Sequence, residues 1–265
     1  MLNLVFSDQL YLGIAQAVVT ALLAILVMLV ARRQQIHIEN EVLIALARGF
    51  IQVVAVGSII VLLLQGPSWT SVFLLAGMML AAGMIASRRA KGIESAFSVS
   101  LYGIAFGSGV VIVLMTFLGV IDTSITTLIP VGSMLIANSM NTNSLALDRF
   151  RAEVESHAGQ IEAGLALGAD PRRVVRPYVK AAVQASLIPR VDTLRSLGIV
   201  WIPGLMAGMV LAGTDPIYAA IYQFVVIAMI FACAGLTAIV STLLIRTHAF
   251  SDAEQLILRA STTDH

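Results

Sequence analysis

Seven apolar runs, each close to the length of a membrane-spanning helix, occupy most of the chain. A helix needs roughly 20 residues to cross the ~30 Å hydrocarbon core of a bilayer. Charged residues make up 12% of the chain and apolar residues 58%, which is far from the composition of a soluble domain. We therefore predict an all-α, polytopic membrane helix bundle with about seven transmembrane helices. The predicted spans are residues 10–31, 42–64, 70–86, 97–121, 126–147, 197–213 and 216–245.

The positive charges between the runs predict an orientation. Lys and Arg follow the first, third and fifth runs and occur in the C-terminal tail, whereas residues 65–71, 119–125 and 214–219 contain none. Cytoplasmic loops of membrane proteins carry an excess of Lys and Arg. We therefore expect the N-terminus outside and the C-terminus in the cytoplasm. The long polar segment, residues 148–195, is then a cytoplasmic part of one domain that spans residues 1–265.

The polar segment 148–195 has the pattern of a helix, a tight turn and a second helix. Gly168 suits the left-handed position that ends a helix, Asp170 suits the N-cap of the next helix, and Pro171 suits its first turn. One apolar face at three- and four-residue spacing precedes the turn and consists of Phe150, Val154, Ala158, Ile161 and Leu165. An amphipathic helix pair resting on the bilayer surface is the alternative.

Glu162, Ala163 and Gly164, followed by the Gly168 and Ala169 of a Leu-Gly-Ala turn, resemble the EAA loop of ABC-transporter permeases. That loop is a cytoplasmic helix pair that docks into a groove of a partner ATPase. Its third position is here Gly164 rather than Ala, and Leu187-Ile188-Pro189 stands further downstream than in importers. The resemblance implies that an ABC ATPase is contacted by Glu162, Ala163, Gly168, Ala169 and Pro171.

Further motifs extend over nearly the whole chain. They are Arg48-x-x-x-Gln52, Asn138-x-Met140, Ile188-Pro189-x-Val191-Asp192, Pro203-Gly204-x-Met206-x-Gly208 and Ala212-Gly213-x-Asp215-Pro216. Together they resemble the FetB-type permeases, a family of ABC exporter membrane subunits linked in bacteria to iron export and in plants to aluminium tolerance. The resemblance implies a permease homodimer in the inner (plasma) membrane that moves a hydrophilic solute, a metal ion such as iron, out of the cytoplasm.

No phosphate-binding loop of the type Gly-x-x-x-x-Gly-Lys-Ser/Thr occurs, because neither lysine, Lys91 or Lys180, follows such a glycine. We therefore expect this chain to bind no cofactor and to be no enzyme, with ATP acting through the partner subunit. The net charge of +1 argues against a nucleic-acid partner. The four histidines lack metal-ligand spacing, so we expect no fixed metal site.

Polar residues inside the runs are candidates for a translocation path. Arg48 and Gln52 share one face of the second run, where Arg48 either acts in transport or snorkels to the surface. Asn138, Asn141 and Asn143 belong to an amide- and hydroxyl-rich part of the fifth run. These amides either line the path or hydrogen-bond neighbouring helices.

The sixth and seventh runs add three further features. Pro203 and Gly204 predict a break at mid-depth, which either lines a cavity or is a packing kink. The thioether of Met206 suits transient contact with a soft metal ion, or simply fills a gap. Asp215 lies at the predicted outer mouth, where it either attracts a departing cation or caps the helix that starts at Pro216.

Two other functional classes are possible for such a chain. A self-sufficient ion-coupled secondary transporter or channel would need membrane-embedded carboxylates, and no Asp or Glu lies deep inside a predicted span. An intramembrane enzyme would need a catalytic group such as His at depth, and the predicted spans contain no His. Both classes rank below the permease.

Overall fold

A computed structural model describes residues 9–34, 39–63, 66–67, 69–88, 95–251 and 255–258. All regular elements in these ranges are helices, so the predicted all-α class is confirmed. Lys91 and Leu64, the last residue of the second predicted span, lie outside the described residues. The chain divides into two compact units, Met1–Gly66 and Pro67–His265, and each is described by itself.

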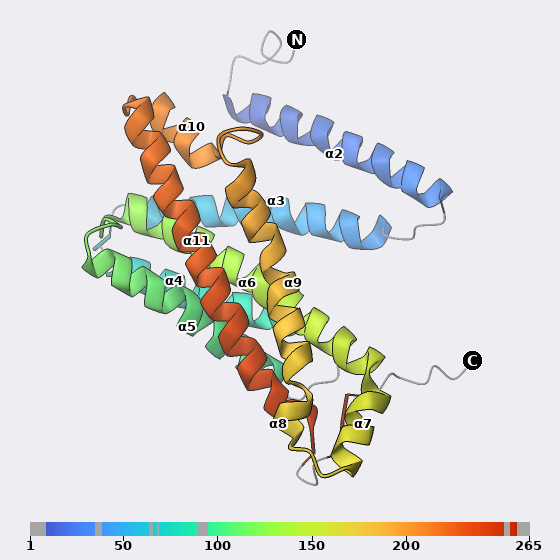
Figure 1. The fold of residues 1–265 in the computed structure, drawn as a ribbon. Helices are drawn as coiled ribbons and strands as arrows, with labels where there is room; N and C mark the ends of the chain where they lie inside the picture. The colour runs from blue at the N-terminus through green and yellow to red at the C-terminus, as the bar shows by residue number, and fades with distance from the viewer. Residues whose placement is uncertain are drawn as a thin grey trace. The chain divides into compact units, whose positions relative to one another are not determined.

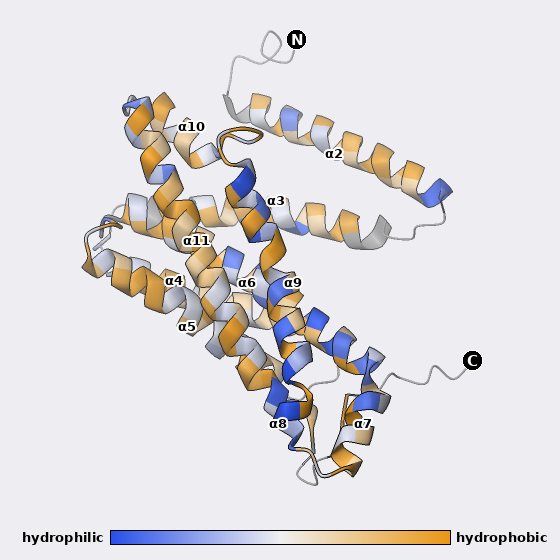
Figure 2. Cartoon of the chain, viewed as in Figure 1, coloured by the Kyte–Doolittle hydropathy of each residue, from blue (hydrophilic) through white to orange (hydrophobic). Residues whose placement is uncertain are grey.

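The first unit contains two long apolar helices, α2 (Gln9–Arg33) and α3 (Glu39–Leu63). Both are long and apolar enough to cross a membrane, and few of their side chains are buried inside the protein. The hydropathy colouring in Figure 2 shows apolar residues along most of the length of α2. Arg32 and Arg33 stand in the last turn of α2, as the first predicted span requires. These helices therefore have the surface expected of segments surrounded by lipid or by other apolar helices.

The second unit is a bundle around α11 (Pro216–Ile245), which packs against α5 (Ala96–Phe117), α6 (Ile125–Ser156) and α9 (Arg176–Ser196). Helix α4 (Thr70–Ser87) packs on α5 and α6. The short helices α7 (Ala158–Ala166) and α8 (Pro171–Val174) lie at one end of this bundle, and α10 (Gly204–Leu211) lies at the other (Figure 1). A 3-10 turn, η1 (Arg246–Ala249), follows α11.

Within the described residues, five helices are long and apolar enough to cross a membrane: α2, α3, α4, α5 and α11 with the turn that follows it. Helix α6, the predicted fifth span, is not among them. It nevertheless packs against α4, α5 and α11, which are all candidate spans. The fourth span ends at Phe117, before the predicted end at residue 121, because Gly119 adopts a left-handed conformation with φ of 73°.

Within the predicted sixth span, residues 197–213, only the eight residues of α10 are α-helical, and the predicted break at Pro203 and Gly204 coincides with the start of this helix. Gly198 has φ of 76°, and Pro203 has extended backbone at the N-cap of α10, so the chain leaves the helical path between them. Several helices share the predicted polar segment 148–195. Residues 148–156 complete α6 and residues 176–195 form most of α9, which leaves 157–175 as the hairpin itself.

Small residues allow α5 and α11 to approach closely. A side-chain carbon at Gly103 would collide with the Ser241 hydroxyl, and one at Gly107 would lie 2.8 Å from the backbone nitrogen of Thr237. The spacing Gly103-x-x-x-Gly107 is the small-residue pattern with which membrane helices bring their backbones together. This contact forms the centre of the bundle.

Candidate coupling hairpin and transport path

The turn between α7 and α8 is closed by two backbone hydrogen bonds. Gly168 N–H donates to the Leu165 carbonyl at 2.9 Å, and Ala169 N–H donates to the Gly164 carbonyl at 3.1 Å. Gly168 has φ of 81°, so it is the left-handed residue of a Schellman motif, as the sequence predicted. A residue with a Cβ would be strained at this position.

The second side of the hairpin starts where the sequence predicted. The Asp170 carboxylate accepts a hydrogen bond of 2.7 Å from Arg172 N–H and caps α8, whose first residue is Pro171. The structure gives a reason for glycine instead of alanine at position 164. A Cβ on Gly164 would lie 3.3 Å from Cγ2 of Val174. The glycine therefore lets α7 lie close to α8.

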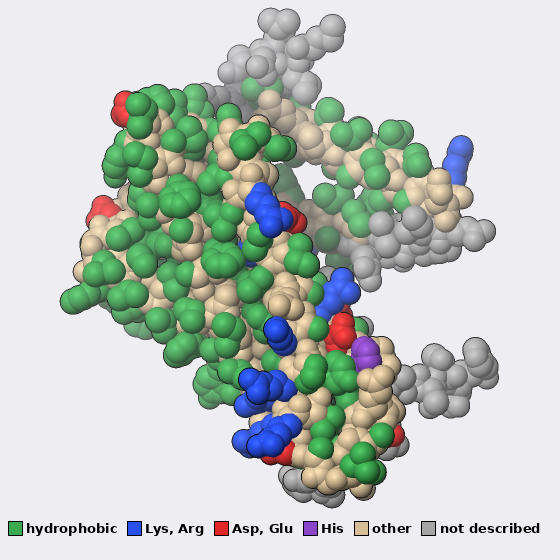
Figure 3. Space-filling model, viewed as in Figure 1, with side chains coloured by type: hydrophobic (Ala, Val, Ile, Leu, Met, Phe, Trp, Pro, Cys, Tyr) green, Lys and Arg blue, Asp and Glu red, His purple; other side chains and the backbone are tan. Residues whose placement is uncertain are grey.

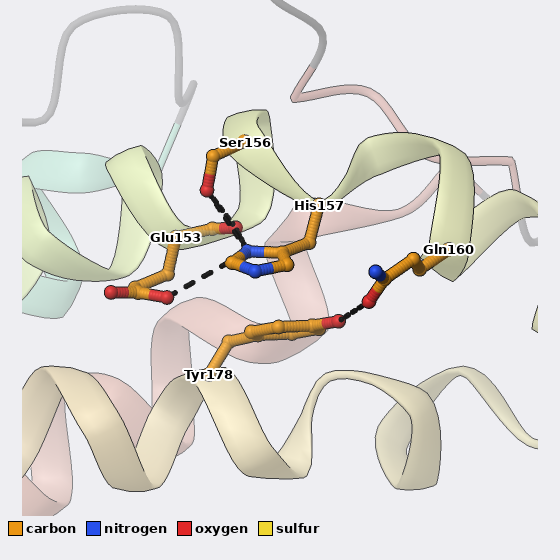
Figure 4. Close-up of polar contacts among 5 residues, drawn as sticks. All are labelled: Glu153, Ser156, His157, Gln160 and Tyr178. Carbon is orange, nitrogen blue, oxygen red and sulfur yellow. Dashed lines mark hydrogen bonds and ion pairs between the residues drawn. The ribbon is translucent and has the colours of Figure 1, made fainter.

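Side-chain contacts brace the hairpin against the long helices (Figure 4). The His157 ring, between α6 and α7, stacks on the Tyr178 ring of α9 with centroids 4.8 Å apart. The Tyr178 hydroxyl lies 3.3 Å from Oε1 of Gln160, to which it donates. His157 also lies 3.7 Å from a Glu153 carboxylate oxygen. The start of α7 is therefore tied to α6 and α9.

Beneath these contacts, a buried apolar cluster joins the hairpin to the bundle. Phe150, Val154 and Ile161 of the predicted stripe are fully buried, while Ala158 and Leu165 pack on the cluster at its edge. The remaining buried members come from the other helices and the tail: Ala96, Val99, Leu147, Val175, Ala182, Ile245, Ala249, Leu256 and Leu258. Packed side chains thus connect the hairpin to α6, α9 and α11.

The tip of the hairpin is exposed, and it carries an apolar residue that sequence reasoning missed. Leu167 is 89% exposed. Glu162, Ala163, Gly168 and Ala169 are exposed beside it, and Pro171 is half-buried. Lys and Arg side chains gather along the adjoining α8 and α9 (Figure 3). The structure thus brings the predicted coupling residues together on one projecting surface with Leu167 at its turn. The exposed apolar residue in the EAA-like turn was the available signal.

A second polar contact lies inside the bundle, between α6 and α9. Arg190 donates from Nη1 to Oδ1 of Asn138. Asn138 is held in this orientation because its Nδ2 donates to the Met134 carbonyl at 2.8 Å. Sequence reasoning did not single out Arg190, because its partner Asn138 is 52 residues away in the chain.

The charge on Arg190 has no carboxylate partner among the described residues. Asp192 instead lies 3.7 Å from Arg195. The Nε atom of Arg190 is buried without a hydrogen-bond partner. A doubly charged cation at about 4 Å from this guanidinium would meet a repulsion of roughly 8 kcal/mol at an effective dielectric constant of ~20. This part of the bundle therefore disfavours a bare metal cation.

The other amides of α6 have different surroundings. Asn143 is fully buried and neither atom of its amide has a hydrogen-bond partner. Asn141 is exposed and helps to line a cavity of about 310 Å³ together with Met140, Ser144 and Asp148. Asn138, Asn141 and Asn143 therefore do not share one surface, and their common role in a path stays a prediction.

The predicted break residues lie at the start of α10. Pro203 is buried at the N-cap and makes no side-chain cap, so Gly204 and Met206 belong to an uncapped first turn. Gln223 of α11 supplies the missing acceptor, because its Oε1 lies 3.2 Å from the Met206 N–H that donates to it. Gln223 is 1% exposed, and sequence reasoning did not single it out.

Other predicted residues have simpler settings. Arg48 and Gln52 are exposed on α3 in the first unit, so their role in a path stays a prediction. The Asp215 carboxylate accepts hydrogen bonds of 3.0 Å from the N–H groups of Ile217 and Tyr218. The capping interpretation of Asp215 is thereby confirmed, while a role at the outer mouth stays a prediction.

Several methionines of the second unit lie against its core. Met78, Met79, Met134 and Met140 pack against the core of the bundle, which supports the gap-filling interpretation. No group of three or more His, Cys, Asp or Glu side chains in the described part of the chain could hold a metal ion.

Comparison with known proteins places this arrangement among membrane proteins. The family described as "Uncharacterised protein family (UPF0014)" matches residues 14–250. The chain is 28% identical to the probable iron export permease protein FetB of Escherichia coli (strain K12) over 239 residues, 89% of this chain and 92% of that protein. It is 29% identical to the protein ALUMINUM SENSITIVE 3 of Arabidopsis thaliana over 252 residues, 94% and 91% of the two chains.

A third relative is a UPF0014 membrane protein of Synechocystis sp. (strain ATCC 27184 / PCC 6803 / Kazusa), which is 32% identical over 235 residues, 85% of this chain and 89% of that protein. No solved structure gives a significant match to the chain.

Proposed function

The chain belongs to the UPF0014 family, whose members are multi-pass membrane proteins, and we propose that it is the permease subunit of an ABC-type exporter driven by a separate ATPase. Family membership confirms the resemblance to the FetB-type permeases. The permease role is supported by the name of the Escherichia coli relative. The solute of this chain is hydrophilic. The name of the same relative suggests that the solute contains a metal such as iron.

The observation that carries the coupling proposal is the exposed hairpin tip on a buried, braced base. Leu167 is 89% exposed, whereas Ile161 of α7, six residues earlier, is fully buried. Leu167 stands at the turn of a hairpin whose sequence resembles the EAA loop, and the base of this hairpin is buried and braced against α6 and α9. Leu167 therefore inserts into an apolar groove of the ATPase, and the braces at His157 transmit the ATPase's movement to the long helices.

The hairpin end of the bundle is then the cytoplasmic end. Positive charge supports this orientation, since Arg172, Arg173, Arg176 and Lys180 follow the tip in sequence. The permease lies in the inner membrane, with its N-terminus outside, and acts as a homodimer. It binds no ATP itself, because the phosphate-binding loop belongs to the partner.

The test is isolation of the tagged permease from its native membranes in mild detergent, with the co-isolated ABC ATPase quantified. Burying a leucine side chain contributes about 1.5–3 kcal/mol, so Leu167→Glu should weaken the complex by roughly 10–100-fold. The permease itself should keep its thermal stability, since the side chain is exposed. Gly159→Ala, on the same helix with open space around it, is the matched control and should retain the ATPase. Equal ATPase recovery from Leu167→Glu and the control would remove the basis for docking at this tip.

A further inference from the structure

Arg190 and Asn138 lie near the middle of the membrane if α6 crosses it. Asn138 stands 13 residues after Ile125, the first residue of α6, and the rise of ~1.5 Å per residue places it about 20 Å along the helix. The surrounding helices α4, α5 and α11 are candidate spans. A charged group at such a depth is costly and marks a functional site by default.

The Arg190 side chain is only partly satisfied in this conformation. Its Nη1 is engaged with Asn138, while its Nε is buried and has no hydrogen-bond partner. The Nε side of a guanidinium fork binds the two oxygens of a carboxylate or phosphate group. Asn138 is neutral and therefore leaves the positive charge uncompensated. The missing partner has the chemistry of an oxyanion.

We propose that Arg190, positioned by Asn138, binds a carboxylate or phosphate group of the transported solute, so that the cargo is an anion. This inference rests on the proposed permease function and specifies its substrate class. A metal leaves the cell as a negatively charged complex with a carboxylate- or phosphate-bearing chelator, rather than as a bare cation. The repulsion between Arg190 and a bare divalent ion is thereby replaced by attraction.

The described residues near this point agree with an anionic cargo. Asn143 and Ser139 of α6 are fully buried and have polar atoms without partners, and both are neutral. The apolar stretches of the candidate spans, residues 11–33, 42–60, 70–87, 96–117 and 216–249, contain no Asp or Glu. A path for bare cations would be expected to offer carboxylates instead.

Binding to the purified full-length permease in neutral detergent tests the proposal. The probes are citrate, pyrophosphate and ferric citrate, compared with manganese chloride at matched ionic strength. We expect the three anions to bind, and Arg190→Gln to lower their affinity at least tenfold. Arg190→Lys keeps the charge but loses the fork, and should bind with intermediate affinity. Arg195→Gln is the control, because Arg195 is exposed and paired with Asp192, and its affinity should equal that of the wild type.

Three results would overturn the proposal. They are absence of binding by all three anions, equal anion affinity in the wild type and Arg190→Gln, or binding of manganese alone. An anionic lipid is a second source of phosphate, so a parallel titration uses phosphatidylglycerol. If only this lipid stabilises the wild type over Arg190→Gln, the site holds lipid and the assignment to cargo fails. Correct folding of each variant is checked by its elution as a single species.

These measurements use the permease alone, so they are independent of ATPase docking. If the wild-type permease binds none of the three anions but still retains the ATPase, the anionic cargo is refuted and the proposed function stands. The opposite pattern would refute coupling through the hairpin and leave the anion site in place.

Discussion

Replacement of Gly107 by Ala should separate α5 from α11. The added Cβ would lie 2.8 Å from the backbone nitrogen of Thr237 and 3.0 Å from the carbonyl oxygen of Cys233. These are backbone atoms of a neighbouring helix, so they cannot rotate away as a side chain could. The two helices must therefore move apart by several tenths of an ångström, and overpacking of this kind costs about 1–3 kcal/mol.

Gly109→Ala is a closely matched control. It makes the same change in the same helix, but its Cβ would meet only the Met79 methyl, at an ordinary distance of 3.8 Å. The gain in helix propensity from Gly to Ala, about 1 kcal/mol, is common to both variants and cancels in their difference. The difference in unfolding free energy between the two variants should then equal the full overpacking cost.

The assay is thermal unfolding of both purified variants in the same detergent. A change of 1 kcal/mol shifts Tm by about 2–4 °C for a chain of this size, so Gly107→Ala should unfold roughly 2–12 °C below Gly109→Ala. Equal Tm values would show that α5 and α11 do not meet at Gly107. They would thereby refute the packing at the centre of the bundle.

Two further predictions concern helix ends. Gln223→Leu removes the acceptor for Met206 N–H and should speed amide hydrogen exchange throughout α10. Gln223→Glu keeps an acceptor and should leave the exchange rate unchanged. Equal exchange rates in both variants would contradict the capping role of Gln223. Asp170→Ala removes the cap of α8 at a cost of about 1 kcal/mol and should speed exchange at Arg172 N–H, and an unchanged rate there would refute the cap.

The hairpin was predictable from sequence because each of its features is local. A left-handed Gly168, a capping Asp170 and an N1 proline depend on neighbours only a few residues away, and the structure has all three. The stripe from Phe150 to Leu165 was equally visible in its spacing. What the spacing could not show is that His157 interrupts this stripe, which α6 and α7 share.

The contacts of Arg190 and Gln223 could not be predicted because their partners are distant in sequence. Asn138 and Arg190 are 52 residues apart, and Met206 and Gln223 are 17 apart. The Arg and Lys content of α9 was the basis for placing it outside the membrane, and whether α9 lies there stays a prediction. Its packing against α6 and α11 could not be read from hydropathy.

Transport by the purified permease in sealed vesicles tests the central claim, that the permease cannot drive transport without a separate ATPase. Ferric citrate is enclosed, and its movement is followed for the permease alone and for the permease with its ABC ATPase and ATP. We expect ferric citrate to move only when the ATPase and ATP are both present on the side of the hairpin. Equally fast movement by the permease alone would contradict it.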